Sequence, residues 1–193
     1  MTAFAQVVLT ILLMFHPHYL DKETEVERKS RLTNLAVAID DVGDRATCAG
    51  KYDVKDCKRV WPGSKTSLAL ALLTRGHFES HFAKNIHAGK CRKWQCDAVK
   101  MYGKTVHLAR TVWQLQWEKT FKDEWDRMLG IELEPSTYAA WAASKKIAQT
   151  YRYCRKGRGV SACRNKRGAQ RVKYYNRLNK KYGKKLRAND NVR

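Results

Sequence analysis

Apolar residues recur at helical spacing along most of the chain, and polar or glycine-rich stretches separate these runs. Residues 67–74, for example, read SLALALLT, and the chain contains no long alternation of apolar and polar residues of the kind that marks strands. Alanine, leucine, lysine and arginine are abundant, whereas valine and isoleucine are sparse, which also favours helices. The pattern therefore predicts an all-α domain of about six helices. The expected helices are Thr2–Phe15, Lys22–Val42, Ser64–Glu79, Lys104–Phe121, Pro135–Tyr153 and Gly168–Tyr182.

The first helix raises a separate question, because residues 2–15 are uncharged and mostly apolar. This run is too short to cross a bilayer as a helix. It also lacks the basic residues and the small-residue cleavage site that flank the core of a signal peptide. We expect a structural helix packed on the domain, with an export or membrane-seeking segment as the alternative. The predicted organisation is an N-terminal helical segment at 1–21, a main domain at 22–183 and a basic tail at 184–193.

The six cysteines fall into three local pairs within or beside predicted loops. An even number at short spacing is typical of disulfides, which form in oxidising compartments, although buried reduced thiols are the alternative. Zinc is disfavoured because no CxxC motif is present and the histidines lack zinc-finger spacing. No glycine-rich phosphate loop occurs either, so neither a metal nor a cofactor is expected. The local pairs are Cys48/Cys57, Cys91/Cys96 and Cys154/Cys163.

The formal net charge of +21 is concentrated towards the C-terminus. From Arg152 to Arg193 the chain has sixteen lysines and arginines and one acidic residue, Asp190. Such a region attracts polyanions, including nucleic acid, anionic lipid and polymers of the bacterial envelope. A solvated basic tail without a fixed partner is the alternative interpretation.

Glu79 is the leading candidate for chemistry, because it follows the apolar run of the third predicted helix. The C-terminal end of a helix disfavours an anionic carboxylate, and the neighbouring Phe78 and Phe82 would remove water from it. Both effects raise the pKa of a carboxyl group, as a general acid at neutral pH requires. Ser80 could orient the group by hydrogen bonding. The competing interpretation is a surface carboxylate that pairs with Arg75 one helical turn earlier.

The motifs around Glu79 resemble those of the lysozyme-like lytic transglycosylases. Residues 79–82 read ESHF after an apolar helix, HAGKC and QCD follow, and residues 111–114 read TVWQ. The resemblance is to a cysteine-containing subgroup of bacteriophage and bacterial cell-wall-cleaving proteins, and it extends from about Leu32 to Leu178. It implies a lysozyme-like helical domain with disulfide-stapled loops at 22–183. The family pattern has glycine where this chain has Thr111, and an aromatic residue where it has Cys163.

The resemblance implies a peptidoglycan-cleaving enzyme with Glu79 as its sole catalytic acid and base. Ser80 would support the site. The residues that would contact the glycan are Trp113, Gln114 and Asn165, and Tyr151 or Tyr153 would take the place of the missing aromatic residue. The reaction would be non-hydrolytic and would leave a 1,6-anhydro product. If Asp97 is a second carboxylate in the cleft, water could be the acceptor instead, giving a muramidase; otherwise Asp97 is a loop-capping residue.

Peptidoglycan strands are accordingly the expected substrate, and the bacterial envelope or periplasm is the expected site of action. A phage virion, with its assembly partners, is the expected carrier. The basic C-terminal region would bind anionic envelope polymers or nucleic acid. The alternative is a structural or nucleic-acid-binding virion protein that keeps the lysozyme-like fold with little catalysis. Tyr174, Tyr175 and Tyr182 lie among basic residues and could stack on bases.

Overall fold

A computed structural model describes residues 1–15, 23–83, 98–101, 104–107, 109–113, 115–116, 135–155 and 166–190. These residues are mainly helical, as predicted. The α-helices are α1 (Ala3–Phe15), α2 (Glu25–Thr47), α3 (Lys65–Ser80), α6 (Pro135–Arg155) and α8 (Lys166–Ala188), with a short 3₁₀ helix, η2 (Gly50–Tyr52). The strands are β1 (Ala98–Met101), β2 (Lys104–His107), β3 (Ala109–Arg110) and β4 (Leu115–Gln116).

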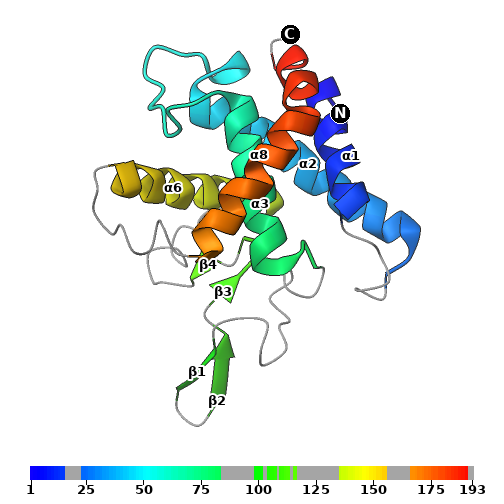
Figure 1. Cartoon of the computed structure of the whole chain (residues 1–193), viewed down its shortest axis with the longest axis vertical. Coiled ribbons are helices and arrows are strands. Elements are labelled where there is room, and N and C mark those ends of the chain that lie inside the picture. The colour runs from blue at the N-terminus through cyan, green and yellow to red at the C-terminus, as the bar shows by residue number, and fades with distance from the viewer. Residues whose placement is uncertain are drawn as a thin grey trace.

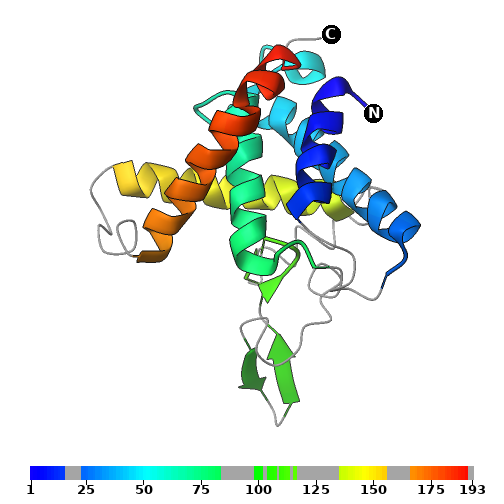
Figure 2. The ribbon, with the colours of Figure 1, turned by 45° about the vertical axis from the view of Figure 1, so that its right-hand side comes forward.

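The helices pack around α3, which contacts α2, α6 and α8 (Figure 1). Its apolar run supplies Leu68, Leu70, Leu72 and Leu73, all of which are buried in one continuous core. α1 packs on α2 and also touches α8, while α6 crosses behind α3 and α8 (Figure 2). α1 is therefore part of the packed domain, and within the described residues no helix is long and apolar enough to cross a membrane.

Local sequence signals determine where α2 and α3 begin. Ser64 is the N-cap of α3, and its hydroxyl accepts a hydrogen bond from the Ser67 amide. Thr24 and Glu27 form a capping box at the start of α2, in which each side chain accepts from the backbone amide of the other residue. α2 continues to Thr47, five residues beyond the predicted end, and places Cys48 beside the loop that returns to Cys57. A disulfide joins these two cysteines.

The predicted helix at Lys104–Phe121 is wrong where the structure describes this stretch. Residues 104–107 pair antiparallel with 98–101, with Val99 opposite Val106, and residues 109–110 pair with 115–116. Ala98–Met101 lies between two of the predicted helices and forms the strand β1, because it pairs with β2. β-Branched Val and Thr recur here, and their restricted side chains favour strands over helices.

The predicted boundary between the domain and a basic tail at residue 184 falls inside α8. This helix continues to Ala188, and Leu186 is fully buried. Immediately after the helix, the Asp190 carboxylate accepts a hydrogen bond from the Thr66 hydroxyl, 3.0 Å away, at the start of α3. The two helices therefore run antiparallel, and α8 is an integral part of the fold.

Candidate functional site

Glu79 lies in the last turn of α3, and α8 supplies its ion-pair partner. The Arg171 guanidinium pairs with a Glu79 carboxylate oxygen. The Glu79 side chain is 16% exposed and that of Arg171 is 33% exposed, so the pair is partly accessible to solvent. The contact follows from the antiparallel packing of α3 and α8, which sets residues 92 positions apart side by side.

Arg75, the partner that the competing interpretation gave to Glu79, also makes a different contact. Its Nε donates a hydrogen bond to the Trp113 carbonyl oxygen, 3.1 Å away. Burial lowers the pKa of the Arg75 guanidinium; the negative charge of Glu79 opposes this effect and the positive charge of Arg171 adds to it. The Glu79 carboxylate therefore lies near two guanidinium groups, those of Arg75 and Arg171. Arg75 also links α3 to the segment around Trp113.

Ser80 joins the end of α3 to residues 111–113. Its hydroxyl lies 2.6 Å from the Val112 carbonyl oxygen and 3.2 Å from that of Gly76, and it accepts from the Phe82 amide at 3.0 Å. Ser80 is only 5% exposed. These hydrogen bonds connect the end of α3 to the backbone of residues 111–113, so Ser80 stabilises the backbone beside Glu79. None of them is the expected hydrogen bond from Ser80 to the Glu79 carboxylate.

Close packing at the same corner depends on a glycine. A Cβ atom added at Gly76 would overlap the ring of Phe82, which is almost completely buried. His81 and Phe82 both have positive φ angles, 51° and 56°, so the chain turns sharply at the end of α3 and folds the Phe82 ring back onto the helix. Phe82 therefore packs on α3 as a core residue.

Thr111 occupies the position at which the resembled family has glycine, and its backbone conformation is one that glycine favours. Its φ is 66°, in the left-handed region, where a β-branched residue is strained. Its side chain is 2% exposed, and its hydroxyl accepts from the Trp113 amide at 3.3 Å. Thr111 thus lies in a tight turn, and this hydrogen bond partly offsets the strain of its backbone.

Trp113 was expected to line a glycan cleft, and here the structure differs. The side chain is 0% exposed, and its indole N–H donates to the Leu72 carbonyl oxygen at 3.0 Å. A ring enclosed in this way presents no face on which a sugar could pack. Trp113 is therefore a core residue that fixes segment 111–113 against α3.

The tyrosines of α8 are engaged with the rest of the domain. The ring of Tyr174 stacks on His77 with centroids 4.2 Å apart, and burial raises the pKa of Tyr174 to about 12. Tyr182 is buried with its hydroxyl 3.1 Å from the Met14 sulfur, and Tyr175 packs against the core. The base-stacking role considered for these side chains therefore lacks an exposed platform.

His77 makes the stability of this corner dependent on pH. Burial, reinforced by His81 and Arg177, lowers the pKa of His77 from 6.5 to about 4. Because the unfolded chain takes up the proton first as pH falls, stability is full above pH 6.5 and is lost progressively towards pH 4. We expect a loss of about 2 kcal/mol, after allowance for partial exposure of the ring.

Urea unfolding measured across this range tests the expectation, with His77→Phe as the matched variant that keeps a ring on Tyr174. The variant should lose that part of the pH dependence. An identical pH profile in both proteins would contradict the assignment.

Several of the predicted site residues lie outside the described residues. These are Asp97, Gln114, Asn165, Cys91, Cys96 and Cys163; Cys154 lies on α6, but its side chain is not described, and the same holds for Tyr153. Tyr151 is exposed and lies 5.7 Å from the ring of Trp61, measured between centroids. Across the described part of the chain, no group of three or more His, Cys, Asp or Glu side chains is arranged to hold a metal ion.

Comparison with known proteins gives no relative. No family model matches the chain, and neither a curated protein nor a solved structure is significantly similar to it.

Arg171 is the residue at this site that sequence reasoning missed. It lies in a run of basic residues, and nothing in its local sequence distinguishes it from the lysines and arginines around it. Its one local signal is the helical period: Arg171 is one turn before Tyr175 and two before Leu178, on the side of α8 that faces the core.

Proposed function

We propose that this protein is a peptidoglycan-cleaving lytic transglycosylase, with Glu79 as the acid and base, which acts in the bacterial envelope and is suited to carriage by a phage virion. The observation that supports this best is the joining of the two family motifs. The Ser80 hydroxyl, next to Glu79, lies 2.6 Å from the carbonyl oxygen of Val112 in the TVWQ motif. Residues 32 positions apart thus form one corner, with a partly exposed carboxylate at its edge.

The proposed reaction needs one carboxyl group. Glu79 would protonate the departing glycosidic oxygen while the N-acetyl group of the muramic acid stabilises the cationic centre. The resulting carboxylate would then accept the proton of the muramoyl 6-hydroxyl as that oxygen closes the 1,6-anhydro ring. Because the Arg171 guanidinium is paired with the Glu79 carboxylate, the glycosidic oxygen of the substrate would have to displace this guanidinium to reach Glu79.

Mass spectrometry of the soluble products from purified sacculi tests the proposal. Anhydro-muramoyl fragments are the expected products. Reducing-end muramic acid would indicate hydrolysis instead and would direct attention to Asp97 as the second carboxylate. Intact sacculi after incubation with folded, oxidised protein would contradict both reactions.

A further inference from the structure

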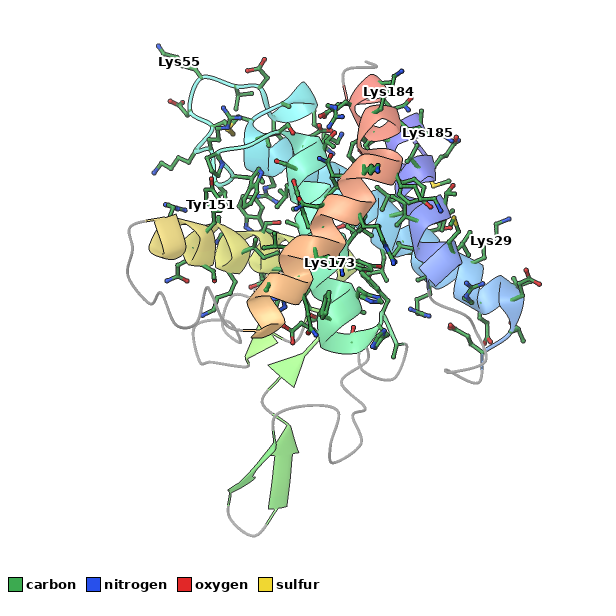
Figure 3. All side chains as sticks on the ribbon, in the orientation of Figure 1. Lys29, Lys55, Tyr151, Lys173, Lys184 and Lys185 are labelled. Carbon is green, nitrogen blue, oxygen red and sulfur yellow. A yellow bond between two sulfur atoms is a disulfide. The ribbon has the colours of Figure 1, made fainter. Side chains whose placement is uncertain are left out.

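The exposed face of α8 carries a row of positive charge that the proposed reaction does not use. Among the side chains of α8 that the structure describes, seven lysines and arginines are exposed, and the sequence of the helix contains no acidic residue. Four of them, Lys173, Arg177, Lys180 and Lys184, recur at the spacing of a single helical face, and we call them the α8 stripe. At the rise of an α-helix the stripe is about 16 Å long. Figure 3 labels Lys173 and Lys184 along this helix.

The fold holds the stripe rigid. The opposite face of α8 buries Leu178, Tyr182 and Leu186 in the core. Arg171 ties the helix to Glu79 at one end, and Asp190 ties the residues after it to Thr66 at the other. A ligand therefore meets charges whose backbone positions are already fixed, which reduces the entropy lost on binding.

The residues of the exposed face indicate which class of polyanion it fits. Its tyrosines are packed inward, so it offers no platform for nucleobases. Val172 is the one large apolar residue of α8 that is well exposed, so the face lacks the apolar area by which a helix inserts into a lipid surface. The four stripe residues form one straight row, and Lys181, Lys185 and Arg187 are exposed beside it. One row suits one extended chain of phosphates, whereas groove-binding proteins contact the two backbones of a duplex on either side of an element.

We propose that the α8 stripe binds a linear polyol-phosphate chain of the bacterial cell wall, for which poly(glycerol phosphate) is the model. The proposal rests on the proposed function for its site of action. Successive phosphates along such a chain can pair with lysines one helical turn apart, and the chain carries neither bases nor acyl groups that would need a further surface. The stripe begins half a turn beyond Arg171, so a bound wall polymer would keep Glu79 close to the glycan strands.

Binding of labelled poly(glycerol phosphate) to the full chain, measured against salt, tests the proposal. Lys173, Lys180 and Lys184 are each changed to Glu in the stripe variant, which leaves Arg177 on its contact with Tyr174. The matched control changes Lys29, Lys55 and Lys146, which are equally exposed but lie on α2, the disulfide loop and α6. Figure 3 labels Lys29 and Lys55, away from α8.

The stripe variant should bind the polymer about 100-fold more weakly than the wild type. The slope of the logarithm of its binding constant against the logarithm of salt concentration should also become less steep by about two, as expected for three lost phosphate contacts on a single chain. The control should lose far less. Equal losses in both variants would overturn the proposal in favour of diffuse charge attraction. Tighter stripe-dependent binding of duplex DNA, single-stranded DNA or anionic vesicles would overturn it in favour of that partner.

Failure of the proposed function would be recognised separately. Cleavage of sacculi from which the phosphate polymers have been removed should be the same for the wild type and the stripe variant, because the substitutions lie on the solvent face of α8. Polymer binding without any cleavage would leave the stripe as a wall-binding surface and contradict the enzyme. Cleavage without stripe-dependent polymer binding would support the enzyme and contradict the stripe as a wall-binding surface.

Discussion

Replacing Glu79 with glutamine is expected to lower the release of soluble muropeptides from sacculi by about 1,000-fold or more, since the substitution removes the group proposed to donate and accept the proton. Glutamine has nearly the same shape and can still hydrogen-bond to the Arg171 guanidinium, so the fold should persist. The rate of product release, measured by chromatography together with a thermal melt, checks both parts.

Glu25→Gln is the matched control for this change. Glu25 lies exposed in the first turn of α2, and its replacement alters the net charge equally without touching the α3 corner. This control should cleave at the wild-type rate. Undiminished cleavage by Glu79→Gln would end the assignment of Glu79 as the acid and base, whatever the products are.

Replacing Trp113 with alanine is expected to reduce the free energy of unfolding by about 3–5 kcal/mol, because it empties a large, fully enclosed volume between α3 and segment 111–113. The change also leaves the Leu72 carbonyl oxygen without the indole donor, which adds to the loss. Urea unfolding at constant pH measures the effect.

Trp113→Phe separates core packing from contact with a glycan. Phenylalanine refills most of the volume without the N–H group, so the loss in unfolding free energy should be well below that of the alanine variant. If Trp113→Ala were nearly as stable as the wild type but failed to bind glycan, the ring would belong to the cleft, and the assignment of Trp113 to the core would be wrong.

Local patterns in the sequence predicted much of the helical framework. The apolar run after Ser64, the N-cap signal of Ser64 itself and the helical spacing from Pro135 onward were sufficient to predict α3 and α6 to within a few residues. Such signals are readable because helix hydrogen bonds and caps connect residues only a few positions apart. The stretch from 104 to 116 was mispredicted, since strand pairing depends on a partner segment that local periodicity does not reveal.

At the candidate site, too, the sequence indicated some of the residues, and only the structure showed how others are placed. The sequence marked Glu79, Ser80 and the TVWQ motif, because residue types in a recurring order can be recognised without coordinates. It did not predict that Trp113 faces the core or that the tyrosines of α8 pack inward. Which side of a helix or turn is buried depends on the elements that pack against it, and the local sequence does not specify these.

The sequence by itself determined the helical class, the position of α3, the excess of positive charge and the choice of Glu79 as the leading candidate for chemistry. The tertiary structure alone decided that Arg171 pairs with Glu79, that Ser80 reaches Val112, and that four cations of α8 share a solvent face. The first two are contacts between residues far apart in the chain, and the third depends on which side of α8 is buried. Antiparallel packing of α3 and α8 brings these groups together, and no local pattern encodes that packing.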